Sequence, residues 1–496
     1  MLRASLPVAC FLTACLLIAT AQPPGVPPKD KKGPPRYEPG KLFPPFVRDE
    51  LQLTPEQAKK LAEIEADVRE KLNKFLTDEQ KKALETLPPP RGPGGGPPGP
   101  PGGPGGPGGG QPVVDTTAKA AFGSEKETPA PPPPPAGVKH LAGRWYLEEG
   151  NNGKPNVYLY RDADKFVDPF SNTGDSNRDG VPDLKVSHDE QCIIIESQNL
   201  PNHPTAKFPN SGNPNTIRAQ NFTFRIPLVP KPAEQITPPP MGPVGIAING
   251  VVFFNPFEAG GMNAVAGYSE VWFDSCCGHP EQRGAYHYHK YPTCVKTPFP
   301  DDGRGHSPVI GFAWDGYPLY GPYVADGVMA KDLKGADALD VCNGRFDPNR
   351  GYHYHATPGK FPYLIGGYAG VVEASNARGA GRGGTGALKD NTSGESREGT
   401  GIASVKPGTA DRGKTRAVRI ELNAAGARIP AVAPSRVVIG PFEATKIARD
   451  GNVVTCEIAI PKDANRGALH DCHVEFETGG RVIALKKNTV FRVGGE

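Results

Sequence analysis

The sequence predicts a mostly β, multidomain protein, and three observations carry this prediction. Short apolar or alternating runs, broken by Gly, Pro, Asn and Asp, recur between about residues 140 and 375, which is typical of strands. The same alternation resumes after residue 415. The 62 Gly and 58 Pro residues concentrate in two low-complexity tracts that cannot bury a core. We therefore expect a β-rich central domain and a C-terminal immunoglobulin-like β-sandwich, with disordered Pro/Gly linkers and a short N-terminal helical hairpin.

The first 21 residues have the features of a secretory signal peptide. An apolar run at 8–18 follows a positive charge, and small residues precede a cleavage site after Ala21. A lipobox ending at Cys15 is the alternative, but the apolar run continues beyond that cysteine, so we favour ordinary cleavage. Residues 22–50, rich in Pro and Lys, are expected to be disordered. The protein is therefore predicted to be exported, periplasmic or secreted, without a transmembrane helix once the signal is removed.

Residues 51–88 are predicted to form a helical hairpin. Thr54 and Gln57 stand three residues apart as a capping box, with Pro55 at the first helical position. The same Leu-Thr-x-x-Gln word returns at 76–80 before a second short helix. In these words the segment resembles the periplasmic LTxxQ-motif proteins, a family of small helical stress and metal-response factors. We favour a hairpin without an activity of its own, which needs a partner surface or self-association to be stable.

Two linkers divide the rest of the chain. The Pro/Gly tract at 89–137 is expected to act as a semi-rigid spacer before the central domain at 138–375. A Gly-rich polar linker at 376–415 precedes the β-sandwich at 416–496. Cys456 and Cys472 lie on two predicted strands of that sandwich and are a candidate disulfide pair.

Charge and cysteine content limit the classes of partner. The net charge of +3 is small, and no basic stripe interleaved with aromatic residues is present, so no nucleic-acid partner is expected. A partner would belong to the cell envelope or the extracellular medium, and its identity is unknown. Removal of the signal leaves seven of the nine cysteines, which an oxidising compartment is expected to convert into disulfides. The odd number leaves one free thiol, one intermolecular bond or one metal ligand.

The word Tyr-His-Tyr-His occurs at 286–289 and again at 352–355. Alternation predicts a strand on which both histidines share one face, with Cα atoms ~6.6 Å apart, and both tyrosines the other. Each word follows an Asp-x-Cys and a Gly, which indicates a duplicated half-site. Two such pairs meeting across paired strands would supply four nitrogens to one transition-metal ion, copper or zinc. The predicted ligands are His279, His287, His289, His353 and His355.

An alternative from a different functional class remains open. Tyrosine and histidine are good strand residues, so the two words could serve only as packing elements of a non-catalytic envelope or extracellular module. The sequence contains neither GxSxG nor HExxH, and no catalytic residue is assigned. A zinc-type reaction would need a general base, for which Asp274 and Asp315 are candidates. Whether the protein is an enzyme is left undecided by the sequence.

A second candidate metal site is a calcium loop at 175–183. Oxygen-bearing residues stand at loop positions 1, 3, 5 and 9, with Gly180 at position 6. Position 12 is Val186 rather than the bidentate Glu of an EF-hand. An Asx-rich turn without metal is the alternative. The candidate calcium ligands are Asp175, Asn177, Asp179 and Asp183.

A series of motifs resembles the YHYH-domain proteins over about residues 185–370. The motifs occur in the family's order: Leu200–His203, Asn213–Asn215, Pro243–Val251, Asp274–His289, Ile310–Pro322 and Cys342–Tyr363. The resemblance implies a secreted or periplasmic protein of unsettled biochemical role, and it gives no activity. Two departures concern cysteines, since Cys277 replaces a usual Gly and the segment 365–368 lacks a usual Cys. The resemblance therefore implies that Cys342 pairs with Cys277 or Cys192.

Overall fold

The computed structural model describes most of the chain after residue 112 and one helix before it. The described residues are 53–75, 77, 113–123, 129–171, 174–258, 261–267, 269–376, 385–392, 401–427, 429, 432–464 and 469–494. They belong to two units, residues 1–98 and 99–496, which are treated separately below. The predicted signal peptide, the predicted disordered segment 22–50 and the second helix of the predicted hairpin lie outside the described residues.

The first unit contains helix α2, Pro55–Phe75. The backbone N–H of Thr54 donates to Oε1 of Gln57 at 2.9 Å, and the N–H of Gln57 donates to Oγ1 of Thr54 at 3.3 Å. This reciprocal pair confirms the predicted capping box and explains why the helix begins here. Neither α-helix among the described residues has the length and apolar composition needed to cross a membrane.

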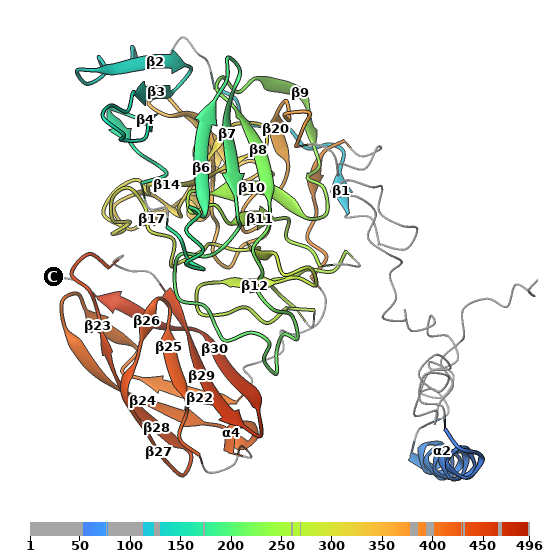
Figure 1. Cartoon of the computed structure of the whole chain (residues 1–496). Coiled ribbons are helices and arrows are strands. Elements are labelled where there is room, and N and C mark those ends of the chain that lie inside the picture. The colour runs from blue at the N-terminus through green and yellow to red at the C-terminus, as the bar shows by residue number, and fades with distance from the viewer. Residues whose placement is uncertain are drawn as a thin grey trace, which may run out of the picture. The chain divides into compact units, whose positions relative to one another are not determined.

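An eight-stranded mixed sheet organises the second unit (Figure 1). At its centre β10 and β14 pair antiparallel, and their side chains Val244, Ile246 and Phe312 are fully buried. Burial on both faces explains why these strands are continuously apolar rather than alternating. In spatial order the strands are β12 (Gly278–Pro280), β13 (Tyr286–Tyr288), β11 (Val252–Phe254), β10 (Pro243–Ala247), β14 (Val309–Ala313), β15 (Pro318–Tyr320), β19 (Gly351–His355) and β18 (Gly344–Asp347).

Smaller sheets cover this central sheet, and several of their residues join its core. For example, the ring of Trp145 packs tilted against Phe312, and the ring of Tyr160 packs edge-on against it. The sheets are β2 (Val138–Ala142), β3 (Trp145–Glu148), β4 (Val157–Asp162) and β5 (Lys165–Val167); β6 (Leu184–His188), β7 (Cys192–Ser197) and β8 (Phe222–Pro227); β9 (Pro232–Thr237) with β20 (Tyr368–Gly370); β16 (Tyr323–Ala325) with β17 (Val328–Met329); and β1 (Val114–Asp115) with β21 (Ala387–Leu388). Two 3₁₀ turns, Ala330–Asp332 and Gly335–Asp337, follow β17.

The central sheet is an internal duplication with approximate two-fold symmetry. Residues of the first repeat have their counterparts 66 positions later, as Tyr286 and Tyr352 do. Ile246 pairs directly with its own counterpart Phe312 across β10 and β14. The symmetry axis therefore passes between the two central strands, and the order β10, β11, β13, β12 is repeated outward as β14, β15, β19, β18. The two YHYH strands, β13 and β19, consequently lie near opposite edges of this sheet.

The Asp-x-Cys words are turns that lead into β12 and β18. Oδ1 of Asp274 accepts the backbone N–H groups of Cys276 at 2.9 Å and Gly278 at 3.2 Å, and Asp340 does the same in the second repeat. A Cβ at Gly278 would overlap the Tyr286 side chain, which packs over the glycine; the counterpart Gly344 is in the same position. The sequence pattern is therefore explained by an Asx turn followed by a close tyrosine contact.

The C-terminal strands form a two-sheet β-sandwich around one core, as predicted (Figure 1). Strands β22 and β23 extend it upstream of residue 416, into the segment predicted to be a linker, which also contains β21. One sheet comprises β22 (Ile402–Lys406), β24 (Thr415–Leu422), β28 (Val453–Ala459) and β27 (Thr445–Asp450). The other comprises β23 (Thr409–Asp411), β30 (Arg481–Gly494), β29 (Leu469–Thr478), β25 (Arg436–Ile439) and β26 (Phe442–Glu443), and the short helix α4 is Ala424–Ala427.

The cysteine predictions are largely wrong. Cys276 and Cys294 form a disulfide. The expected Cys456–Cys472 bond is absent, because both thiols are free and buried in the sandwich core. Burial raises the pKa of Cys456 to about 11, and it also raises that of Cys472, which disfavours the thiolate that oxidation requires. The expected pairing of Cys342 fails as well; the free and buried cysteines are Cys192, Cys277, Cys342, Cys456 and Cys472.

We predict that the sandwich loses stability in mild acid through His470 and His473. Both rings are buried on β29 with no hydrogen-bond partner on either nitrogen, and burial lowers their pKa values to about 4 and about 3. A lowered folded-state pKa contributes stability that is present above the unfolded value, ~6.5, and is lost as the pH falls. His473→Phe should therefore reduce the loss of unfolding free energy between pH 7.5 and pH 5 by about 2 kcal/mol in urea denaturation.

His140→Phe is the matched control for this measurement, because His140 is exposed. It should show the same pH dependence as the unmodified protein. An unchanged pH dependence in His473→Phe would contradict the prediction.

Candidate metal centres

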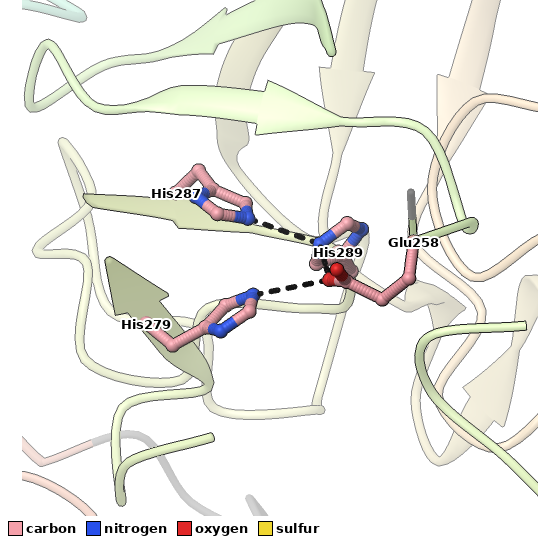
Figure 2. Close-up of side chains that lie close together, drawn as sticks. All are labelled: Glu258, His279, His287 and His289. Atoms are coloured by element: carbon pink, nitrogen blue, oxygen red, sulfur yellow. Dashed lines mark hydrogen bonds and ion pairs between the residues drawn. The ribbon is translucent and has the colours of Figure 1, made fainter. Parts of the chain in front are cut away.

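Three histidines and one glutamate converge at the first YHYH strand, and we call this cluster centre 1. Its members are Glu258, His279, His287 and His289, whose potential ligand atoms all lie within 4.8 Å of one another. His279 lies on β12 directly opposite His287 on β13, and His289 follows β13 immediately. Glu258 reaches the cluster from the loop after β11. Figure 2 shows the four side chains directed toward a common point.

Hydrogen bonds to backbone carbonyls determine which ring nitrogens face each other in centre 1. Nδ1 of His287 lies 3.0 Å from the carbonyl oxygen of Ala285, and Nδ1 of His289 contacts the carbonyl of Asn255. A carbonyl oxygen can only accept, so both neutral rings carry their proton on Nδ1 and a lone pair on Nε2. Those two Nε2 atoms are 3.0 Å apart (Figure 2). Two lone pairs at this distance repel each other unless a cation lies between them.

The other two members of centre 1 are held differently. Oε1 of Glu258 lies 3.4 Å from Nε2 of His289 and 3.7 Å from Nε2 of His279. Nε2 of His279 is buried without a hydrogen-bond partner. The side-chain NH2 of Asn213 donates to Nδ1 of His279 at 3.3 Å, so this neutral ring carries its proton on Nε2, unlike its neighbours.

Centre 2 lies at the second YHYH strand and consists of His306, His353 and His355, again within 4.8 Å. Nδ1 of His353 lies 2.8 Å from the carbonyl oxygen of Gly351, and Nδ1 of His355 lies 2.7 Å from that of Gly321. Nε2 of His353 and Nε2 of His355 are 3.1 Å apart, which reproduces the arrangement of centre 1.

His306, the third member of centre 2, has the same tautomer as His353 and His355. Its Nδ1 lies 2.9 Å from the carbonyl oxygen of Ser307, and its Nε2 is buried without a hydrogen-bond partner. All three rings of centre 2 therefore hold their proton on Nδ1 and present a lone pair on Nε2. Hydrogen bonds of this kind orient metal-ligating histidines and fix their tautomers in known metal sites.

Burial keeps five of these rings neutral, those of His279, His287, His306, His353 and His355. It lowers the pKa of His287 to about 3 and that of His306 to about 4. Burial also lowers the pKa values of His279, His353 and His355 well below the ordinary range. The one proton of a neutral ring stays on Nδ1 where a backbone carbonyl accepts it, so Nε2 of His287, His306, His353 and His355 remains open to a metal ion.

The expectation that both histidine pairs share one ion is wrong. In the sheet, β11, β10, β14 and β15 separate β13 from β19. At the usual strand spacing this corresponds to ~24 Å, far beyond the reach of a shared ligand shell. The physical reason is the duplication. Its two-fold axis passes between β10 and β14, so the YHYH strands of the two repeats lie on opposite sides of this axis.

Two cluster members, Glu258 and His306, were not predicted as ligands. Each is a single residue in a loop, outside the repeated words, and 66 positions away stand Val324 and Pro240, which cannot ligate a metal. Without a repeated or periodic pattern, the sequence contains no signal that sets them apart from other acidic residues and histidines.

The tyrosines occupy the opposite face and bind the carboxylates that were candidate bases. The hydroxyl of Tyr286 donates to Asp274 at 2.7 Å, and that of Tyr354 donates to Asp315 at 2.5 Å. Burial raises the pKa of Asp274 and of Asp315 to about 6. Because alternate side chains of a strand point to opposite faces, neither carboxylate is directed at the histidines. Both carboxylates hold tyrosine hydroxyls in place, and neither is positioned to act as a base beside the histidines.

A cavity of about 480 Å³ adjoins centre 1 and includes Glu258 and His279 in its wall. Trp272, Glu270 and Lys486 line it as well, and Nζ of Lys486 lies 3.1 Å from Oε1 of Glu270. This cavity provides a polar route by which an ion could reach the cluster.

The candidate calcium loop contains no carboxylate cluster. Asp175 accepts the backbone N–H groups of Asp179 at 3.0 Å and Gly180 at 2.9 Å, and Asp179 accepts that of Val181 at 2.8 Å in an Asx turn. Oδ2 of Asp183 accepts from Ser176, while its Oδ1 is buried without a partner. No group of three potential His, Cys, Asp or Glu ligands among the described residues includes these side chains. Calcium binding by Asp175, Asn177, Asp179 and Asp183 remains a prediction.

A third cluster, formed by His203 with Cys276 and Cys294, is not a comparable candidate. Its two sulfur atoms are joined in the disulfide, so they are not available as thiolate ligands. His203 instead contacts the hydroxyl of Tyr288 at 2.6 Å.

Comparison with known protein families finds a match in the central region of the chain. Residues 223–334 match the family model described as YHYH protein. No curated protein and no solved structure matches the chain. The matched segment ends before the second YHYH word, although β19 and β18 complete the same sheet. The central part of this chain therefore contains a YHYH domain.

Proposed function

We propose that the YHYH domain binds two transition-metal ions, one at centre 1 and one at centre 2. The first ion would be held by His287, His289, His279 and Glu258. The second would be held by His353, His355 and His306. In both centres the histidines would bind the ion through Nε2, which the fold already directs into the cluster.

The observation that carries this proposal is the pair of facing lone pairs in each repeat. The Nε2 atoms are 3.0 Å apart in centre 1 and 3.1 Å apart in centre 2. In a tetrahedral site with metal–nitrogen distances of 2.0–2.1 Å, neighbouring ligand nitrogens lie ~3.3 Å apart. A shift of a few tenths of an ångström would therefore admit an ion, and the ion would convert repulsion between lone pairs into coordination.

The donor set favours zinc or copper. Neutral imidazole suits both ions, and a carboxylate oxygen completes a four-coordinate zinc site. Thiolates do not contribute, since the disulfide cysteines are unavailable and neither centre contains a free cysteine. Zinc would serve as a structural ion or as a Lewis acid, whereas copper would add redox chemistry.

Export is part of the proposal. The N-terminal residues have the composition of a signal peptide, and the Cys276–Cys294 disulfide is expected in an oxidising compartment. We take the protein to be periplasmic or secreted, where it would acquire its metal after translocation.

The alternative function is a non-catalytic module in which the YHYH strands only pack. The buried tyrosine face supports a packing role for half of each word. Packing does not account for the histidine face. In a purely structural pair of neutral histidines, one ring would be expected to carry its proton on Nε2 and to donate it to an acceptor outside the pair. The two functions differ in whether metal is bound.

We predict a stoichiometry of two ions per chain. After loading with zinc or copper and removal of the excess, elemental analysis should find two equivalents in the unmodified protein. His287→Ala and His353→Ala should each retain one equivalent, and the double variant none, because each removes one of the two facing nitrogens of its centre.

The exposed variant His140→Ala is the control and should retain two equivalents. Equal metal content in the unmodified protein and the double variant would contradict the proposal. Absence of metal from a correctly folded unmodified protein would favour the packing alternative.

We also predict that metal stabilises the fold. An ion that binds only the folded state adds about 2.7 kcal/mol to the unfolding free energy at a free concentration of 100 times its Kd. Urea denaturation of the metal-free protein, with and without zinc, measures this effect. Zinc should not stabilise the His287→Ala, His353→Ala double variant; equal stabilisation of both proteins would show binding elsewhere.

A further inference from the structure

The two centres differ at the position opposite the first histidine of each pair. Across β12 and β13, His279 stands opposite His287, and across β18 and β19, Arg345 stands opposite His353. Directly opposed residues on paired strands project to the same face with Cβ atoms ~5 Å apart. Centre 2 therefore has a guanidinium on the side where centre 1 has an imidazole.

The carboxylate of centre 1 is missing from centre 2. Val324 stands 66 residues after Glu258 and offers no ligand atom. His306 supplies a third nitrogen from a different loop, and no carboxylate belongs to the cluster. Centre 1 thus offers four protein ligands with one negative charge, whereas centre 2 offers three neutral imidazoles.

The carboxylates near Arg345 are already engaged. Oδ2 of Asp347 lies 3.6 Å from Nη1 of Arg345, and its Oδ1 lies 4.0 Å from Nη1 of Arg350. Nε of Arg350 pairs with Asp162 at 2.8 Å. Nε of Arg345 is buried without a hydrogen-bond partner. A divalent ion in centre 2 would therefore have no carboxylate within the cluster itself to offset its charge.

We infer that centre 2 is an open metal centre that takes a small anion as its fourth ligand, with Arg345 as the residue that holds this anion. The inference rests on the proposed function. The anion would bind the metal through one atom and accept a charge-assisted hydrogen bond from the guanidinium. Candidate ligands are small oxyanions, a short carboxylate or hydroxide.

Exposure at centre 2 is consistent with exchange of such a ligand. His353 and His355 are fully buried, whereas His306 and Arg345 are partly exposed. A small anion would therefore approach from the side of His306 and Arg345, whereas the YHYH histidines are shielded. This arrangement, with three imidazoles and one exchangeable position, is the ligand pattern of catalytic rather than structural zinc sites.

Cobalt(II) provides the test, because its visible absorption reports on ligand exchange. We expect thiocyanate to change the spectrum of cobalt-loaded protein and of His287→Ala, which retains only centre 2. It should leave the spectrum of His353→Ala, which retains only centre 1, unchanged. In His287→Ala, adding Arg345→Ala should weaken thiocyanate binding about tenfold while cobalt stays bound.

Arg345→His is the second variant, and it places in centre 2 the residue found in centre 1. In the His287→Ala background it should keep cobalt and lose the response to thiocyanate, since the added imidazole occupies the open position. Cobalt bound at centre 2 with no response to thiocyanate would overturn the inference and leave the proposed function standing. Unchanged thiocyanate affinity in both Arg345 variants would show that Arg345 does not hold the anion. Absence of cobalt from centre 2 would overturn both this inference and the proposed function of centre 2.

Discussion

Strict alternation of tyrosine and histidine on β13 and β19 is the constraint on which the rest of this domain depends. Because a strand sends alternate side chains to opposite faces, each word separates two tasks over four residues. The tyrosines enter the core and bind buried carboxylates, as Tyr286 does with Asp274. The histidines turn away from that core and face each other. A one-residue slip in register would exchange the two faces and destroy both tasks at once.

The histidine face places polar groups where burial is costly. A buried ring nitrogen without a hydrogen-bond partner is destabilising, and each centre contains one, Nε2 of His279 and Nε2 of His306. Backbone carbonyls satisfy Nδ1 of His287 and His353, but Nε2 of each ring faces Nε2 of the second histidine of its own pair. A fold that repeats this arrangement twice maintains an unfavourable contact in the absence of an ion. Such stored strain is expected at a binding site and is difficult to explain as packing.

The duplication provides an internal comparison between two related sites. The same turn, glycine contact and carbonyl partners recur in both repeats, so the shared parts belong to the scaffold that aims the histidines. The differing parts, His279 and Glu258 in one repeat and Arg345 and His306 in the other, would set the number and charge of the ligands that each centre offers. Divergence at these positions leaves the centre of the sheet unchanged, because His279 and Arg345 lie on its edge strands and Glu258 and His306 lie in loops.

Local patterns were enough to predict much of this protein. Alternation predicted the strands, the capping box at Thr54 predicted the start of α2, and the repeated YHYH words predicted the histidine pairs and their common face. These features depend on near neighbours in the chain. Cysteine pairing was predicted poorly. The sequence around Cys456 and Cys472 is equally compatible with a disulfide and with two free thiols in the core, and the thiols are free.

The tertiary structure alone decided that there are two centres rather than one, because strand order across a two-fold axis is not encoded in the spacing of the words. It also decided which loop residues complete each centre: Glu258 and His306 come from loops whose paths depend on the whole sheet. The sequence by itself therefore determined which side chains share a face, through the period of the strand. Only the tertiary structure determined what that face meets, since contacts between distant segments arise from packing of the complete sheet.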